Sequence, residues 1–148
     1  MGKWIRLLRR FRQQTPERQL LLVDGLIALV CARLALQLFS FKKLTARLRR
    51  AKESIGGRSR GETERICRDV GWAVERIGDM LPGMTCFPRG LAAQWMCRSR
   101  GVDAVLYYGV AVFPEKGLAA HVWVQSGDRG VVGHTISSDY RVMSRFPQ

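Results

Sequence analysis

The sequence predicts an α+β fold in which helices come first and a small antiparallel sheet follows. Two observations carry this prediction. Apolar residues recur at helical spacing as far as residue 99, whereas the runs after residue 104 are rich in β-branched and aromatic residues, as strands are. The chain has 148 residues, of which 47% are hydrophobic, so a single domain with a proper core is expected and a disordered chain is excluded.

The N-terminal third is predicted to begin with two helices. Residues 3–12 are basic and amphipathic, and the Thr-Pro-Glu sequence at 15–17 is typical of a helix start, because threonine caps and proline suits the first helical position. Residues 20–39 then form a helix that is apolar nearly all round, as helices buried in protein or in lipid are. Asp24 and Arg33 interrupt this run, so a central core helix and a helix at or in a membrane both stay open.

A glycine-rich linker is predicted to separate the next two helices. Residues 41–52 continue the helical spacing among basic side chains, and residues 54–61 are polar and rich in glycine and serine. Another helix is expected from about residue 62 to residue 80, where a Leu-Pro-Gly turn ends it. We therefore expect a helical N-terminal segment, residues 1–60, and a core, residues 61–148, within one compact unit.

The C-terminal part is predicted to hold one helix and three strands. The helix covers residues 86–99 and is closed by Gly101. The strands cover 104–113, 119–126 and 130–136, with turns rich in proline, glycine and aspartate between them. A short chain of strands joined by tight turns indicates an antiparallel sheet.

The charge is concentrated in the N-terminal segment. The formal net charge is +13. Residues 1–60 hold 15 basic and 3 acidic side chains, net +12, whereas residues 61–148 hold 10 and 9, net +1. An anionic partner such as a membrane surface would therefore meet the basic N-terminal segment. The nearly neutral remainder argues against a nucleic-acid-binding protein.

The four cysteines indicate a reducing compartment. Disulfide scaffolds and zinc sites usually have closely spaced cysteines, whereas these four are far apart in the sequence. We therefore expect free thiols, no metal and no cofactor. The N-terminus has the outline of a signal peptide, but its apolar run is interrupted and no small-residue cleavage site follows Phe39. We expect a cytoplasmic protein, at most held at the inner face of the membrane.

Cys86 is the candidate nucleophile. It lies directly after a Pro-Gly loop, in the first turn of a predicted helix that Thr85 could cap, and the positive end of a helix favours the thiolate form. Arg89 adds positive charge nearby. The alternative is that Cys86 is a small buried hydrophobic residue. The other three thiols, Cys31, Cys67 and Cys97, are interpreted as structural, with Cys31 and Cys67 expected to be buried.

His121 is the candidate general base. It lies on a predicted strand between apolar neighbours, where it is either a core histidine or the imidazole that takes the thiol proton. A third group should then accept a hydrogen bond from the imidazole. The acids downstream are Asp128, in a predicted turn, and Asp139, after the third strand, and His134 is a neutral alternative.

Several motifs together resemble those of the leader peptidases of lasso-peptide biosynthesis, a transglutaminase-like cysteine protease family. The resemblance covers nearly the whole chain. It begins with the leucine-rich helix that ends near the Phe-Lys-Lys-Leu sequence at 41–44. The later motifs are Thr-Cys-Phe-Pro-Arg-Gly-Leu-Ala at 85–92, Gln-Trp at 94–95, Arg-Gly-Val at 100–102, Gly-Val at 109–110 and Ala-His-Val-Trp-Val at 120–124.

This resemblance implies a papain-like or transglutaminase-like catalytic core at residues 61–148 and a Cys-His-Asp triad. Its thiol and imidazole map onto Cys86 and His121. In the family the acid follows the histidine by about a dozen residues, but this chain has no acid there. Asp139 is therefore the candidate orienting acid, with Asp128 and His134 as alternatives.

The resemblance also implies a substrate and partners. The activity would be removal of the leader from a ribosomally made precursor peptide, before a separate asparagine-synthetase-like, ATP-dependent cyclase forms the macrolactam. A separate polypeptide is expected to supply the leader-recognition domain, because the first 60 residues show no strand alternation. The alternatives are a non-enzymatic, membrane-associated adaptor and an amidase or acyltransferase on the same fold.

Overall fold

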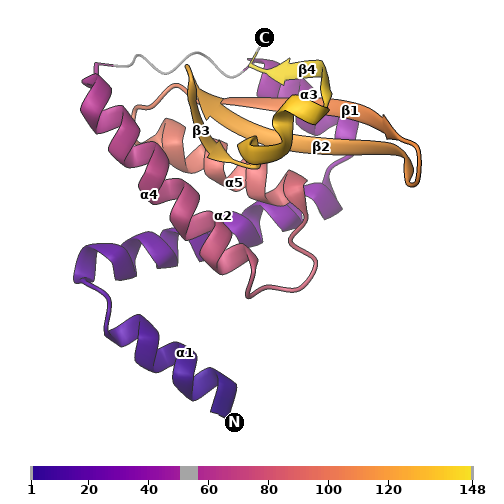
Figure 1. The fold of residues 1–148 in the computed structure, drawn as a ribbon. Coiled ribbons are helices and arrows are strands. Elements are labelled where there is room, and N and C mark those ends of the chain that lie inside the picture. The colour runs from indigo at the N-terminus through magenta and orange to yellow at the C-terminus, as the bar shows by residue number, and fades with distance from the viewer. Residues whose placement is uncertain (1, 51–56, 148) are drawn as a thin grey trace.

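The computed structural model describes residues 2–50 and 57–147 and confirms the α+β class (Figure 1). Five helices come first: α1 (Gly2–Arg12), α2 (Pro16–Leu38), α3 (Phe41–Arg50), α4 (Arg60–Gly78) and α5 (Cys86–Ser99). The strands are β1 (Val105–Phe113), β2 (Gly117–Ser126), β3 (Arg129–Val132) and β4 (Arg141–Phe146), with the 3₁₀ helix η1 (His134–Asp139) before the last. Part of the linker predicted at 54–61 lies outside the described residues, and the boundary at residue 60 stays a prediction.

The hydrophobic core lies between the sheet and helices α2, α4 and α5. Leu29, Val70 and Met96 contribute one fully buried side chain from each helix, and Leu106 and Val124 face them from β1 and β2. The helices of the core therefore come both from the predicted N-terminal segment, which supplies α2, and from the predicted catalytic core, which supplies α4 and α5.

Helix α2 belongs to the hydrophobic core along one side only. Its inner face packs against α4 and α5 through Leu22, Ala28 and Leu29. Its outer face is exposed, and Cys31 lies on it, so the prediction that this thiol is buried is wrong. A helix that is apolar on all sides gives no periodic signal of which side faces the protein, so the sequence alone could not show this.

The sheet has four antiparallel strands in the order β3-β2-β1-β4. β4, which pairs with β1 at the edge, is missing from the sequence-based prediction. The third strand is shorter than predicted, because Gly133 takes a left-handed backbone conformation (φ 65°) and the chain continues as η1. This left-handed turn brings the segment after β3 back beside β2.

Helix α4 begins with a complete capping box. The backbone N–H of Glu62 donates to the Ser59 hydroxyl, and the backbone N–H of Ser59 donates to the Glu62 carboxylate. These bonds lower the pKa of Glu62. The two threonines expected to cap other helices, Thr15 and Thr85, make no side-chain cap bond.

Helix α5 lies unusually close to strand β2. A Cβ on Gly90 would come within 2.7 Å of Val122 Cγ1, so only glycine allows this approach. One turn further on, the buried Gln94 amide donates to the carbonyls of Ala104 (3.1 Å) and Phe146 (2.6 Å). These contacts fix α5 against the sheet and so fix the position of its first residue, Cys86.

Two glycines of α4 test the packing of this helix on β3. A Cβ on Gly71 would lie 2.3 Å from the Val131 carbonyl oxygen, whereas nothing lies within 4 Å of one on Gly61. We expect Gly71→Ala to lower the free energy of unfolding by about 1–3 kcal/mol, because the backbone of β3 must move. Gly61→Ala should raise it by up to about 1 kcal/mol, because alanine favours the helix. Urea denaturation followed by circular dichroism measures both, and equal effects would contradict this packing.

Candidate active site

Cys86 and His121 line the same pocket. Its volume is about 210 Å³, and it lies between the start of α5, strand β2 and the segment after β3. Glu75, Arg89 and Gly133 are also among its lining residues. Within the described residues no hydrogen bond joins the Cys86 thiol to the His121 imidazole.

Cys86 is the first residue of α5, as the sequence predicts. The first N–H groups of a helix have no acceptor within the helix, and they carry the positive end of its dipole. The Thr85 hydroxyl does not cap them. Pro88 sits in the same turn, where its missing N–H costs no helical bond. The thiol is partly exposed at this end of the helix, which places it within reach of a substrate.

Arg89 holds the loop before Cys86 in place. Its Nη1 pairs with Glu75 (2.5 Å) and Asp79 (2.9 Å) on and just after α4, and its Nε donates to the Met84 carbonyl (2.9 Å). Burial opposes the charge, but the hydrogen bonds to Asp79 and Glu75 outweigh it and raise the pKa of Arg89. The cation that the sequence suggested near Cys86 is therefore an anchor between α4 and α5.

His121 is held by a backbone carbonyl. Its Nε2 lies 2.7 Å from the Gly133 carbonyl oxygen, 12 residues further along the chain. The ring also packs against Trp123 (centroid distance 6.0 Å) and Tyr140 (5.1 Å). These contacts fix the imidazole on one side of β2.

The carbonyl also determines the tautomer of the imidazole. A carbonyl oxygen only accepts hydrogen bonds, so Nε2 must carry the proton in this bond. In the neutral ring, Nδ1 is then the atom with a free lone pair. Nδ1 of His121 is therefore the nitrogen able to accept a proton from a thiol.

The three side chains considered as orienting groups lie elsewhere. Asp139 is exposed at the end of η1, and Asp128 is exposed in the turn between β2 and β3. His134 is exposed and lies over Gly130. Within the described residues none of the three hydrogen-bonds to His121. Sequence reasoning did not consider the Gly133 carbonyl, although the resemblance implied an acid in this segment, about a dozen residues after the histidine.

Two of the other thiols are buried together in the core. Cys67 and Cys97 are hydrogen-bonded partners on α4 and α5, and both are 0% exposed. The hydrogen bond with Cys67 and burial raise the pKa of Cys97. Cys97 is thus unsuited to act as a nucleophile at neutral pH.

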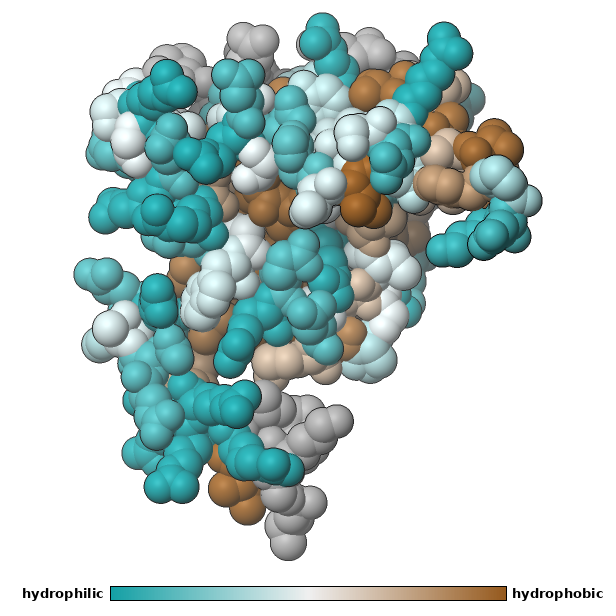
Figure 2. Space-filling view, viewed as in Figure 1, coloured by the Kyte–Doolittle hydropathy of each residue, from teal (hydrophilic) through white to brown (hydrophobic). Residues whose placement is uncertain are grey.

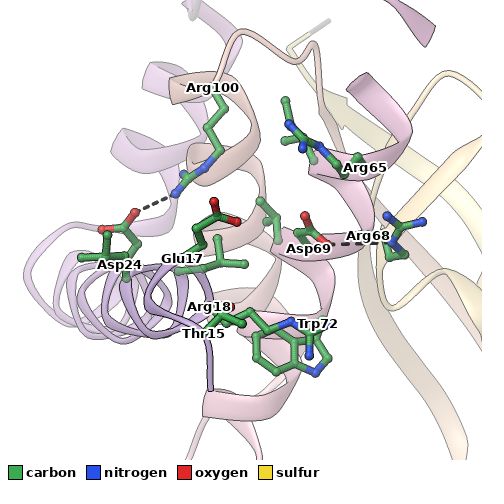
Figure 3. A pocket seen from close by; sticks show the side chains of 13 residues that line it. Thr15, Glu17, Arg18, Asp24, Arg65, Arg68, Asp69, Trp72 and Arg100 are labelled. Atoms are coloured by element: carbon green, nitrogen blue, oxygen red, sulfur yellow. Dashed lines mark hydrogen bonds and ion pairs between the residues drawn. The ribbon is translucent and has the colours of Figure 1, made fainter. Parts of the chain in front are cut away.

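A larger pocket, about 630 Å³, lies elsewhere in the fold (Figure 3). It lies where α2, α4 and the end of α5 meet, and it contains neither cysteine nor histidine. Four of its charged groups form ion pairs: Asp24 with Arg100 at 2.6 Å and Asp69 with Arg68 at 3.8 Å. We place the candidate active site in the smaller pocket because the thiol and imidazole are there.

The fold and the site define a class of protein. Helices followed by an antiparallel sheet, with a cysteine at a helix N-terminus and a histidine on an adjoining strand, form an α+β core of the papain-like or transglutaminase-like kind. The chain belongs to the transglutaminase-like superfamily, which it matches over residues 26–145. This superfamily generally comprises cysteine peptidases and acyltransferases. No curated protein and no solved structure matches the chain.

The substitution Gly133→Ala tests whether the Gly133 carbonyl orients the His121 ring, because it places a methyl group beside that contact. In Gly133→Ala the Cβ would lie 3.0 Å from His121 Nε2 and 2.8 Å from the Val122 carbonyl oxygen. We expect the imidazole to move and to lose its preference for the Nε2–H tautomer. Nitrogen-15 NMR of the His121 ring, recorded on the folded variant, measures this.

Gly117→Ala is the matched control. Gly117 has a similar backbone angle (φ 71°), but nothing lies within 4 Å of an added Cβ. It should cost about 1 kcal/mol of stability without changing the His121 spectrum. Asp139→Asn should also leave the spectrum unchanged, and a tautomer change in that variant would return the orienting role to Asp139.

Proposed function

We propose that the protein is a cysteine peptidase that removes the leader from a lasso-peptide precursor before a separate cyclase forms the macrolactam. The observation that carries the proposal is the shared pocket of Cys86 and His121, with the imidazole fixed by the Gly133 carbonyl. Membership of a superfamily of cysteine peptidases and acyltransferases supports the chemistry. The motifs around both residues support the substrate class.

The proposed reaction begins with proton transfer. Nδ1 of His121 takes the proton of the Cys86 thiol, and the sulfur forms a bond to the carbonyl carbon of the scissile peptide. The imidazolium then gives its proton to the leaving amine as the C–N bond breaks. Water, deprotonated by the same imidazole, then attacks the thioester carbon, the C–S bond breaks, and the imidazolium returns its proton to the Cys86 sulfur as the leader leaves with a free carboxylate. The Gly133 carbonyl keeps the ring in place throughout, because the Nε2–H bond survives each step.

The helix start supplies the oxyanion stabilisation. The negative charge on the tetrahedral intermediate develops on the former carbonyl oxygen, next to the attacked carbon. The backbone N–H of Cys86 has no acceptor within α5 and points along the positive end of the helix. Removing one donor of this kind typically lowers kcat by a factor of about 10²–10³.

The size of the pocket favours a peptide over a small molecule. Sites for small-molecule ligands measure about 300–1,000 Å³, whereas this pocket measures about 210 Å³. It has room for one side chain beside the scissile bond. The rest of an extended peptide would then lie on the surface, where a recognition partner would hold it.

We also propose that a separate polypeptide presents the leader to Cys86. Residues 2–50 form helices, and the only sheet in the described residues carries His121. Recognition in trans would raise the effective concentration of the scissile bond without adding chemistry. The asparagine-synthetase-like cyclase would use the newly exposed amine.

The thiol is tested by a pair of cysteine variants. Cys86→Ala should abolish cleavage of the precursor, with a loss of at least about 10⁴ in kcat, because the nucleophile is gone. Cys31→Ala, at an exposed thiol outside the pocket, should keep wild-type activity. Mass spectrometry of a purified precursor incubated with each variant measures this. Normal cleavage by the Cys86 variant would end the peptidase proposal.

The recognition partner is tested by adding it to the same assay. Alone, the protein should cleave the full-length precursor slowly with a high KM, and the separate leader-binding domain should lower KM by about 10²-fold, with a smaller effect on kcat. Efficient cleavage without the partner, unchanged on its addition, would rule out presentation in trans.

A further inference from the structure

The outer face of helix α2 is an apolar stripe that runs the length of the helix. The residues recur three or four positions apart, which places them on one side of the helix. Each is 41–75% exposed: Leu20, Val23, Ile27, Val30, Leu34 and Leu38. A contiguous apolar surface of this length marks an interaction site in a protein of this size.

The two charged residues within the apolar run of this helix, Asp24 and Arg33, each bond to a group elsewhere in the protein, although the Asp24 side chain stays 51% exposed. Asp24 turns toward the end of α5, where its carboxylate meets Arg100 Nη2 at 2.6 Å (Figure 3). Arg33 Nη1 donates to the Gly83 carbonyl at 2.5 Å, in the loop that leads to Cys86. These two side chains interrupt the apolar run in the sequence, but in the fold neither belongs to the outer stripe, which consists of uncharged residues.

Basic helices flank the stripe on both sides in the chain. Helix α1 contains five basic and no acidic residues, and α3 likewise contains five and none. Figure 2 shows a mostly hydrophilic surface over α1, at the bottom of the view, broken by a hydrophobic patch. Ile5 and Leu8 of α1 are both 61% exposed. A charge-free apolar stripe between two cationic amphipathic helices complements an anionic lipid surface.

The packing of α2 favours a helix lying in the interface over one that spans the bilayer. α2 is long and apolar enough to cross a membrane. However, Leu29 is 0% exposed against α4 and α5, and spanning would remove it and the rest of the inner face from the core. It would also carry Asp24 and Arg33 into hydrocarbon without their partners. A helix seated in the interface keeps both sets of contacts.

We infer that the outer face of α2 docks on an anionic membrane surface, with the basic helices α1 and α3 against the lipid headgroups. The stripe would enter the headgroup and acyl boundary, and the core beneath would stay in water. The Arg33–Gly83 bond would then join the membrane-bound helix to the loop before Cys86. The inference is independent of the peptidase proposal.

Vesicle flotation of the full chain tests the inference. The vesicles are phosphatidylcholine alone or with about one-third phosphatidylglycerol. We expect binding to the anionic vesicles at least about tenfold tighter than to the neutral ones, weakening as ionic strength rises from about 0.1 M to about 1 M. Ile27→Gln/Leu34→Gln should reduce the binding at least about tenfold, because it removes apolar surface from the stripe.

A matched control uses two apolar residues that are as exposed but lie elsewhere. Val112 and Leu118, 76% and 75% exposed, pair across the β1–β2 hairpin, which projects away from the helices in Figure 1. Val112→Gln/Leu118→Gln should bind the anionic vesicles as the wild type does. Equal loss in both variants would overturn the inference.

A label on Cys31 reports the depth of α2 directly. In a Cys86→Ala background Cys31 is the exposed thiol of the described residues, so a polarity-sensitive fluorophore attaches there. We expect a blue shift with anionic vesicles. No binding, or an unshifted fluorophore, would overturn the inference. The inference would also be overturned if Ile27→Gln/Leu34→Gln left vesicle binding unchanged but altered the sedimentation of the protein without vesicles. The stripe would then be a contact between copies of this chain.

Discussion

The close approach of helix α5 to strand β2 is the constraint on which the candidate site depends. At Gly90 there is no space for a side chain, since a Cβ would come within 2.7 Å of Val122 Cγ1. Cys86 lies one turn earlier on α5, and His121 directly precedes Val122 on β2. The same contact therefore packs the core and brings thiol and imidazole to one pocket. A bulkier residue at position 90 would separate the two chemical groups along with the two elements.

In the proposed reaction, backbone groups would carry out tasks that side chains carry out in a Cys-His-Asp triad. The Gly133 carbonyl accepts the imidazole N–H, and the positive φ of Gly133 turns the chain so that this carbonyl faces His121. The start of α5 offers N–H donors beside Cys86 because no hydroxyl caps them. The carboxylates near the pocket, Glu75 and Asp79, instead neutralise Arg89 and fix the loop before the thiol.

The sequence predicted the features that depend on local pattern. The kinds of elements and their order follow from periodicity and turn residues, and the position of Cys86 at the start of a helix follows from the Pro-Gly loop before it. The fourth strand was missed, because its pattern of exposed and apolar residues does not alternate clearly. The contact between the Gly133 carbonyl and His121 could not be predicted from the sequence. Every residue has a backbone carbonyl, and only the folded chain shows which one faces the imidazole. The exposed side of α2 was hidden for a similar reason, because its apolar residues surround the helix.

The rates at which individual thiols are alkylated test whether His121 activates Cys86, and the measurement needs no substrate. Iodoacetamide is added at neutral pH, and peptide mass spectrometry follows Cys86 against the exposed Cys31 of the same chain. We expect Cys86 to react at least about tenfold faster than Cys31, because a neighbouring base would supply the thiolate. His121→Ala should remove this advantage. Equal rates in the wild type, or an advantage that survives His121→Ala, would contradict this activation.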